Sequence, residues 1–344
     1  MAGTSVSLLF IIGGGDDSDR IVPTGSKLAV SGTTDLTKLL LDREPHHRLH
    51  VTRNYFRQSR QADLSQYTCL VNLITEPEQN ARVLENLKKL LRNLPGRVIN
   101  KPEAVLRSTR DQVARLLTGI PGLIVPKAVR LNGNKAPIAA RIIEKAGVVP
   151  PFILREVGTH TGKIVGLFDS IEGAVAALEK GKEYFATQFV DFAGSDGLYR
   201  KYRVYFIGRR VILRHMFVSD QWNVHVSDRA RFMAGRPETI AEERDLFESA
   251  EPFNHDVKKV FSAIRERMPL DFFGMDFGMP PDGDVVLFEA NAAMSFFPLW
   301  PGSDPQFEYL TACFAPAQAA FRELLGLPQQ SAGIGAFPVR LQTG

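Results

Sequence analysis

Short apolar runs alternate with one long amphipathic stretch over the first hundred residues. Residues 6–12 and 67–74 are almost continuously apolar, which is typical of strands buried on both faces. Residues 78–94 carry apolar side chains at helical spacing, and a Pro-Gly pair ends that helix. A short third strand is expected at 98–100. This alternation of strand and helix predicts an α/β layer.

After residue 100 the pattern predicts helices first, then strands joined by turns. Helices are expected at 102–117, 170–180 and 238–268, and strands at 123–126, 151–156, 164–168, 185–191, 199–206 and 211–218. Residues 199–206 alternate basic and aromatic side chains, so Lys201 and Arg203 share one face of their strand. An exposed edge strand protected by charge would show the same pattern. These elements predict α+β sections behind the α/β layer.

Residues 272–294 form the most informative stretch and read FFGMDFGMPPDGDVVLFEANAAM. Two apolar runs flank an Asp-Gly pair, which is a strong hairpin signal because glycine tolerates positive φ. With Asp282-Gly283 as a two-residue turn, Asp276 lies opposite Glu289. Asn291, two residues further along, then shares the face of Glu289. On the face of Asp276 the neighbouring residues are glycines 274 and 278, which are expected to leave room above the sheet.

This hairpin would bring two carboxylates and one amide oxygen together. Unpaired carboxylates at such a spot repel, and one of them would protonate. A hard cation removes the conflict, and oxygen ligands of this kind suit Mg²⁺. A three-residue loop would instead move Glu289 away from Asp276. The competing interpretation is a surface hairpin with solvated acids, which the apolar residues around Glu289 disfavour.

Composition narrows the class of protein. A chain of 344 residues with 44% hydrophobic residues suggests two or three domains, or one large composite fold with a substantial core. The net charge of +4 argues against an obligate nucleic-acid binder. Two cysteines, Cys69 and Cys313, require neither a disulfide nor a zinc site, which fits a reducing cytoplasm. The apolar start is short, so a strand is expected there rather than a signal peptide, and no membrane partner is expected.

Three further stretches could contact an anion, and each has a structural alternative. Residues 13–15 are glycines after a strand, where a phosphate could sit, although a tight turn explains them equally. Residues 45–60 are basic and aromatic, which is also the composition of a solvated face. Residues 157–163 form a flexible loop with glycines, hydroxyls and a lysine after Arg155, which could fold over phosphates or be a plain hairpin turn.

Taken in order, these features resemble the ATP-grasp superfamily, closest to its branch of RimK- and glutathione-synthetase-like ligases. The resemblance covers about residues 95–300 and is most specific in the ending D-F…F-E-A-N. It implies an ATP-grasp fold: an N-terminal α/β pre-ATP-grasp domain followed by two α+β subdomains that sandwich ATP. The implied division is 1–100 for the first domain, 101–190 for the central subdomain with the phosphate loop, 191–326 for the C-terminal subdomain with the metal site, and 327–344 for a flexible tail.

The resemblance also implies roles for individual residues. Mg²⁺, or Mn²⁺ in its place, would bind Asp276, Glu289 and Asn291. ATP would be bound by Arg110, Arg155, Gly158, Thr159, His160, Thr161, Gly162, Lys163, Gln188, Phe189, Val190 and Asp191. Within this set, Gln188, Phe189 and Val190 match the adenine-binding hinge. The residues at the reacting groups would be Arg203, Lys201, Asn223 and His225.

The chain departs from the family pattern at several of these positions. Arg110 and Arg155 stand where the family has lysines, and an arginine keeps the charge but changes the geometry. Lys201 stands where an aspartate is usual, Gln221 replaces a basic residue, and a glycine pair after residue 225 is absent. These departures indicate a divergent branch, whose substrates cannot be inherited from its relatives.

The implied activity is that of an ATP-dependent carboxylate–amine ligase. A substrate carboxylate would attack the γ-phosphate, and an amine would then attack the acyl phosphate to form an amide, with a lid at 158–163 excluding water. The expected partners are a small-molecule or peptide carboxylate, an amine and a second copy of the chain in a homodimer. Three alternatives remain: a phosphotransferase of the same fold, a catalytically silent nucleotide-binding or scaffold protein, and an NAD-dependent enzyme that uses residues 13–15.

Overall fold

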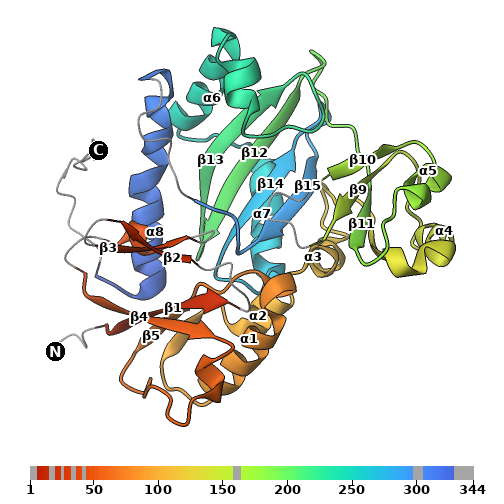
Figure 1. The fold of residues 1–344 in the computed structure, drawn as a ribbon. Coiled ribbons are helices and arrows are strands. Elements are labelled where there is room, and N and C mark those ends of the chain that lie inside the picture. Colours follow the sequence, from red (N-terminus) through yellow and green to blue (C-terminus); the bar gives the residue numbers. More distant parts are fainter. Residues whose placement is uncertain are drawn as a thin grey trace.

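A parallel sheet forms the N-terminal layer of the protein. The computed structural model describes residues 6–14, 20–24, 27–31, 36–40, 44–157, 164–296 and 305–328. The first sheet has the order β4-β1-β5-β6, with β4 at His46–Thr52, β1 at Leu8–Gly14, β5 at Cys69–Asn72 and β6 at Arg97–Ile99. Helices α1 (Pro77–Leu91) and α2 (Pro102–Leu106) follow it, and a separate hairpin pairs β2 (Arg20–Thr24) with β3 (Lys27–Ser31). The predicted α/β layer is therefore confirmed (Figure 1).

Two of the stretches that could contact an anion lie in this sheet, and the structure explains one of them, the glycine stretch, without an anion. Gly13 lies inside β1, and a Cβ atom there would meet the Val51 carbonyl oxygen of β4 at 2.0 Å. The close approach of the β4 backbone therefore explains this glycine without a phosphate. The basic stretch at 45–60 forms the edge strand β4 and the turn after it, with mostly exposed side chains. Gly15 lies outside the described residues.

Gly13→Ala is expected to destabilise the fold by roughly 3 kcal/mol, because the new methyl group would push β4 away and the residue has a φ of +124°. The free energy of unfolding in urea measures the effect. Gly235→Ala is the control, since a Cβ there would meet no atom within 4 Å. Equal stability of the two variants would contradict this account of Gly13.

An antiparallel sheet of four strands forms a separate small layer. Its order is β10-β9-β11-β8, with β10 at Ile164–Phe168, β9 at Phe152–Glu156, β11 at Glu183–Gln188 and β8 at Ala128–Asn132. Helices α4 (Ala136–Lys145) and α5 (Ile171–Ala176) pack against it around a core of their own. The predicted hairpin of β9 and β10 is confirmed, and its loop at 158–163 lies outside the described residues.

A mixed sheet of five strands forms the largest layer. Its order is β13-β12-β14-β15-β7, with β13 at Arg210–Ser219, β12 at Tyr199–Ile207, β14 at Phe272–Gly278, β15 at Val285–Asn291 and β7 at Leu123–Ile124. The helices around it are α3 (Arg110–Leu117), α6 (Pro237–Glu248), α7 (His255–Arg267) and α8 (Phe314–Leu325). Because β12 lies between β13 and β14, the alternative of an exposed edge strand at 199–206 is wrong.

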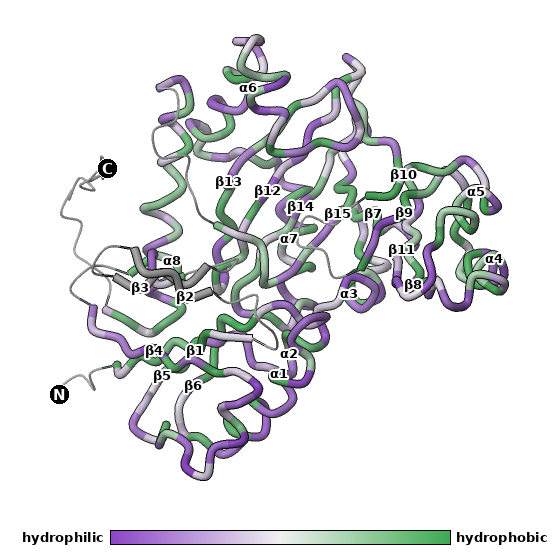
Figure 2. The backbone as a smooth tube through the Cα atoms, viewed as in Figure 1, coloured by the Kyte–Doolittle hydropathy of each residue, from purple (hydrophilic) through white to green (hydrophobic). Residues whose placement is uncertain are grey.

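The two faces of the large sheet are buried against different elements. One face packs on α7, with Phe206 and Phe277 against Phe261. The other face packs at one end on α8 and on the first sheet, through Tyr205, Phe272 and Phe321. Figure 2 shows hydrophobic and hydrophilic positions alternating along α7 and α8, as expected for helices that each rest on a sheet.

Asn100 joins the first layer to the strand that carries Asp276. Its side-chain oxygen accepts hydrogen bonds from the backbone amides of Asp271 and Phe272. Its own backbone amide donates to Asp271 Oδ2 at 2.9 Å. Asn100 adopts a φ of +51°, a conformation that asparagine tolerates better than most residues. The start of β14 is thereby fixed to the end of β6.

Several element boundaries differ from the prediction. The helix expected at 170–180 ends at residue 176, the strand expected at 185–191 ends at 188, and the helical stretch at 238–268 is divided into α6 and α7. The strand β8 and the helices α4 and α8 were not predicted from the sequence. The division of the chain at residues 100, 190 and 326 stays a prediction.

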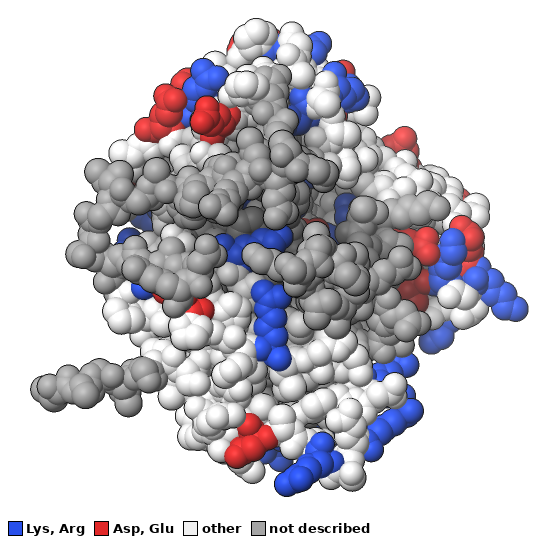
Figure 3. Space-filling view, turned by 60° about the vertical axis from the view of Figure 1, so that its left-hand side comes forward, with Lys and Arg blue, Asp and Glu red and all other residues white. Residues whose placement is uncertain are grey.

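The outer surface offers few further clues to function. No helix in the described part of the chain is long and apolar enough to cross a membrane. Cys69 and Cys313 are both buried and unbridged. On the face shown in Figure 3, the described lysine and arginine side chains form small groups, several of them next to acidic side chains.

Candidate functional site

The hairpin of β14 and β15 has the predicted pairing but not the predicted turn. Asp276 lies opposite Glu289, as expected. However, the connection runs from 279 to 284, and the amide of Gly283 donates to the Pro280 carbonyl, so the turn is centred on 281–282. A bulge leaves Phe288 without a paired residue and restores the alignment of Asp276 with Glu289. The expected two-residue turn at Asp282-Gly283 is therefore wrong.

The glycines beside Asp276 do not leave open space. A Cβ on Gly274 would lie 2.8 Å from Met294 Sδ, and a Cβ on Gly278 would lie 2.7 Å from the ring of Phe192. These two side chains fill the room above the glycines, which corrects the sequence-based expectation. Asp276 is consequently enclosed on its own strand, with an exposed fraction of 5%.

Asp276 forms a two-point ion pair with Arg203 on the neighbouring strand. The two residues are directly paired between β12 and β14, with Arg203 Nε 2.5 Å from Oδ1 and Nη2 2.8 Å from Oδ2. Burial opposes ionisation of Asp276, but Arg203, supported by Lys201 and Arg110, lowers the pKa of this carboxyl below its usual value. Asp276 is therefore a carboxylate at neutral pH.

Glu289 is held by an arginine from a different part of the chain. Arg110, at the start of α3, places Nη2 3.0 Å from Glu289 Oε1 and donates from Nη1 to the Phe288 carbonyl at 2.5 Å. Asn291 Nδ2 also donates to Glu289 Oε1, at 2.9 Å, while its own Oδ1 accepts from the Ala293 amide. The three residues proposed as metal ligands thus lie together on adjacent strands.

Two further cations face these carboxylates. Arg155 on β9 lies close enough to Arg110, Glu289 and Asp276 for their charges to act on it. Its burial, and to a lesser extent the positive charge of Arg110, lower the pKa of Arg155 to about 10. Lys201 on β12 donates from Nζ to the Val224 carbonyl at 2.5 Å, and burial lowers its pKa as well. Arg155 and Arg203 come from different sheets, so the site spans the small and the large layer.

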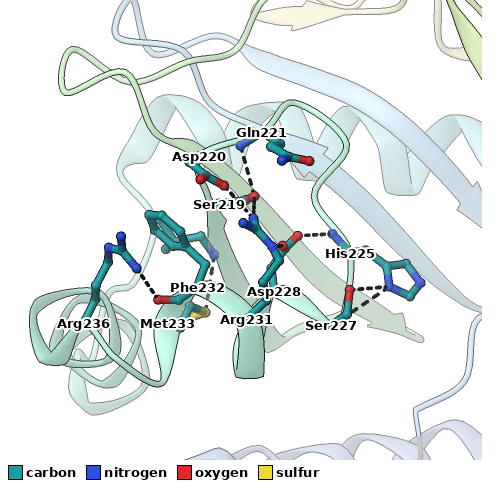
Figure 4. Close-up of polar contacts among 11 residues, drawn as sticks. Ser219, Asp220, Gln221, His225, Ser227, Asp228, Arg231, Phe232, Met233 and Arg236 are labelled. Atoms are coloured by element: carbon teal, nitrogen blue, oxygen red, sulfur yellow. Dashed lines mark hydrogen bonds and ion pairs between the residues drawn. The ribbon is translucent and has the colours of Figure 1, made fainter.

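A loop after β13 presents Trp222, Asn223 and His225. The side chain of Asp228 holds this loop through two hydrogen bonds. Its Oδ2 accepts from the His225 backbone amide at 2.7 Å, and its Oδ1 accepts from Arg231 Nε at 2.7 Å. Arg231 also donates to Ser219 Oγ at 2.8 Å, which ties the loop to the end of β13 (Figure 4). Burial, with a contribution from nearby Lys201, lowers the pKa of His225, so this ring is neutral at neutral pH. The part of the loop that carries His225 is thus held in place.

A cavity of about 720 Å³ joins these groups. It is bounded by β9 and β11 of the small sheet on one side and by β12 to β15 of the large sheet on the other (Figure 1). Its apolar wall includes Ile153, Phe189 and Leu287, and Phe189 meets Trp222 edge to face with ring centroids 5.6 Å apart. This size and this mixture of apolar walls and a few polar groups are typical of sites for small molecules.

Most of the sequence-predicted site residues line this one cavity. They are Arg110, Arg155, Gln188, Phe189, Val190, Lys201, Arg203, Asn223, His225, Asp276, Glu289 and Asn291. Asp191 is exposed, and its Oδ1 accepts from the Ala193 amide instead. Residues Gly158, Thr159, His160, Thr161, Gly162 and Lys163 lie outside the described part of the chain.

Sequence reasoning missed other residues that line the cavity, above all Arg214, His215 and Trp222. Arg214 and His215 lie in a strand that was predicted correctly at 211–218. Their consecutive positions did not indicate that both line one cavity, because neighbours in a regular strand point to opposite faces.

The donor set fits Mg²⁺ if the ion enters together with an anion. Two carboxylates and an amide oxygen suit a hard cation that takes its remaining ligands from phosphate and water. The described residues contain no cluster of three or more His, Cys, Asp or Glu side chains that could hold a metal alone. In this structure Arg203 and Arg110 neutralise the two carboxylates. A bound polyphosphate could attract these arginines and so leave the carboxylates to the metal ion.

Comparison with known proteins gives a fold but no near relative. No family model matches the sequence, and no curated protein matches it. The solved structures that resemble it include the ADP complex of N5-carboxyaminoimidazole ribonucleotide synthetase, with 12% identity and a TM-score of 0.51 over 96% of this chain and 80% of the other. The D-Ala:D-Ser ligase VanG of Enterococcus faecalis has 12% identity and a TM-score of 0.49, covering 91% of this chain and 100% of its own.

A RimK-domain ATP-grasp protein of Sphaerobacter thermophilus is 14% identical, with a TM-score of 0.48 over 90% of this chain and 99% of the other. At these identities the likeness concerns the fold alone. The likeness to the ribonucleotide synthetase covers 96% of this chain and so includes the three layers described above: a parallel N-terminal sheet, a small antiparallel sheet and a large mixed sheet, with the cavity between the last two. The chain therefore has the ATP-grasp fold.

Proposed function

We propose that the protein binds ATP and Mg²⁺ in this cavity and uses them as a carboxylate–amine ligase. The observation that carries the proposal is the charge of the cavity wall between the two sheets. Four cations, Arg110, Arg155, Lys201 and Arg203, surround two carboxylates, those of Asp276 and Glu289. Glu76, Glu78 and Glu156 line other parts of the cavity, so the excess of positive charge is local to this cluster. That local excess suits a polyphosphate, while Asp276 and Glu289 suit its metal ion.

The two ends of the cavity suit the two parts of the nucleotide. The base would lie against the apolar wall of Ile153, Phe189 and Leu287, next to the free end of β11 at Gln188. The phosphates would reach Arg155 and Arg110, whose planar guanidinium groups can each contact two oxygens. Mg²⁺ held by Asp276, Glu289 and Asn291 would neutralise charge on the phosphate oxygens.

The proposed reaction has two steps. An oxygen of the substrate carboxylate attacks the γ-phosphorus, the bond to the β–γ bridging oxygen breaks, and ADP leaves with that oxygen. The nitrogen of an amine then attacks the carbonyl carbon of the acyl phosphate. Phosphate leaves with the carbon–oxygen bond electrons, and the nitrogen loses its proton to water. Arg203 faces the reacting phosphoryl group in this arrangement, so its charge would be most useful in the transition state.

Nucleotide turnover tests the proposal directly. Purified protein is incubated with ATP and Mg²⁺, and ADP is measured with a mixture of carboxylates, with a mixture of amines, and with both. A ligase releases ADP steadily only when both are present. Steady release with carboxylates alone, with the phosphate retained on the acid, would instead indicate a phosphotransferase. Failure to bind ATP at all would overturn the proposed function.

Arg155→Ala is expected to weaken the binding of ATP with Mg²⁺ by roughly 1.5–3 kcal/mol, the usual value of a hydrogen bond to a charged group. Its pKa of about 10 keeps Arg155 charged at neutral pH, and β9 holds it in place on a strand rather than on a loop. Calorimetry measures the dissociation constant.

The matched control is Arg141→Ala, which removes an exposed arginine from α4 of the same small layer. This variant should bind ATP as the wild type does. If Arg155→Ala binds equally well, then the phosphates do not lie between β9 and β14.

A further inference from the structure

A β-bulge in β13 turns two consecutive side chains toward the cavity. Arg203 pairs with His215, but Val204 pairs with Leu213, so Arg214 is the additional residue. A bulge of this kind bends the strand and re-aims side chains that would otherwise alternate. Arg214 and His215 accordingly both line the cavity, on the side of Arg203 opposite to Asp276.

His215 is a buried polar side chain whose ring faces the cavity. Its exposed fraction is 6%, and Nε2 has no hydrogen-bond partner among the residues that the structure describes. The ring is stacked on Phe217, with centroids 4.0 Å apart and an interplanar angle of 21°, so its orientation is fixed. Buried polar atoms are nearly always paired, so an unpaired one on a residue that lines a cavity calls for a partner.

The charges around His215 indicate what kind of ligand fits. Burial, together with the positive charges of Arg203, Arg214, Arg229 and Lys201, holds its pKa well below the usual value. The ring is neutral at neutral pH and can donate one N–H. Arg203 is paired with Asp276, and Arg229 is paired with Glu243. The attraction for an anion, and the repulsion of an ammonium group, therefore rest on Arg214 and Lys201. Of the two proposed substrates, the acid therefore fits here and the amine does not.

We propose that His215 and Arg214 form a carboxylate-binding subsite at the β13 end of the cavity, in which His215 Nε2–H donates to the acid substrate. The assignment of this acid as the substrate that reacts with ATP rests on the proposed function. The anion subsite itself rests on the geometry of β13 alone. It lies beside Arg203, so a carboxylate bound there is next to the group that would face the γ-phosphate.

Acetate is the minimal probe of this subsite. It is titrated into the full-length protein against sodium chloride at equal ionic strength, with and without ADP and Mg²⁺. Saturation transfer to the acetate methyl group reports binding, and ¹⁵N-histidine spectra report the His215 ring, which is assigned from its loss in His215→Phe. Wild type should bind acetate with a dissociation constant on the order of 10 mM, alone and with the nucleotide.

His215→Phe keeps the stacking on Phe217 but removes the N–H, and should weaken acetate binding by about tenfold without changing the affinity for ADP and Mg²⁺. His215→Gln keeps a donor and should retain most of the acetate affinity, which guards against a folding defect in the first variant. The control His255→Phe, at the exposed start of α7, should behave as the wild type.

Three results would overturn the subsite: no acetate binding to wild type, equal acetate binding by His215→Phe, or displacement of acetate by ADP. The proposed function fails separately. If acetate binds through His215 but calorimetry shows no binding of ADP or ATP, then the anion subsite stands and the ligase does not.

Discussion

Glu289→Gln is expected to lower the rate of ADP formation by about 100-fold or more. Glutamine keeps the size of the side chain and can still contact Asn291, but it removes the negative charge proposed to hold Mg²⁺. Charge stabilisation by a metal is worth several kcal/mol, and each 1.4 kcal/mol corresponds to a tenfold change in rate. Steady-state release of ADP, measured with carboxylate and amine mixtures, provides the comparison.

The fold should survive this substitution. Glu289 has an exposed fraction of 37%, and Arg110 retains its contact to the Phe288 carbonyl. The melting temperature should therefore stay close to that of the wild type. Glu85→Gln, which removes an exposed carboxylate from α1, is the control and should be fully active. Normal turnover by Glu289→Gln would refute the metal-site assignment.

Arg203→Met is expected to reduce kcat by roughly 100- to 1,000-fold while changing the KM for ATP by less than about tenfold. A cation that faces the moving phosphoryl group stabilises the transition state more than the bound substrate. Lys201 should not replace it, because its Nζ is already bonded to the Val224 carbonyl. A rise in KM alone would show that Arg203 is an ordinary binding residue.

The same substitution should also destabilise the protein, by about 3–5 kcal/mol, because it leaves the buried Asp276 carboxylate without its partner. In the wild type the lowered pKa of Asp276 gives stability above about pH 3.9, its unfolded value, and this is lost as the pH falls through the folded pKa. In Arg203→Met burial raises that pKa instead. The loss of stability relative to the wild type should thus be largest at neutral pH and become smaller in acid.

Two further variants separate these effects. Asp276→Asn combined with Arg203→Met removes the unpaired charge and should recover part of the stability but none of the activity. Arg210→Met removes an exposed arginine from the far end of β13 and should change neither the stability nor the activity. A double variant no more stable than Arg203→Met would contradict the ion-pair account.

The candidate site was predictable where the signal is local. Asp276, Glu289 and Asn291 lie within sixteen residues of one another in a pattern of period two, so one hairpin places them on one face. Even there the predicted turn was wrong, and the bulge at Phe288 restored the pairing. A bulge depends on twist and packing across the sheet, which the sequence of one strand does not encode.

Elements whose residues are only partly apolar were harder to predict. The strand β8 is half-buried at the edge of its sheet and contains Arg130 and Asn132, so it lacks a clear apolar run. The helix α8 has a stronger apolar face, yet its role between the first layer and the large sheet follows only from its packing on Phe10 and Phe272. Intrinsic propensity is a weak guide in both cases, because tertiary context decides.

By itself, the sequence determined the order of strands and helices in the first layer, the fold resemblance and the charged residues at the centre of the cavity. Only the tertiary structure decided how their charges combine. Arg110 reaches Glu289 and Arg203 reaches Asp276 across large sequence separations, and β9 brings Arg155 from another sheet. His215 lies beside Arg203 because the two residues are paired between β13 and β12, and the bulge adds Arg214 next to it. Ion pairs and bulges depend on distances in space, and hydrophobic periodicity records only which face of an element is buried.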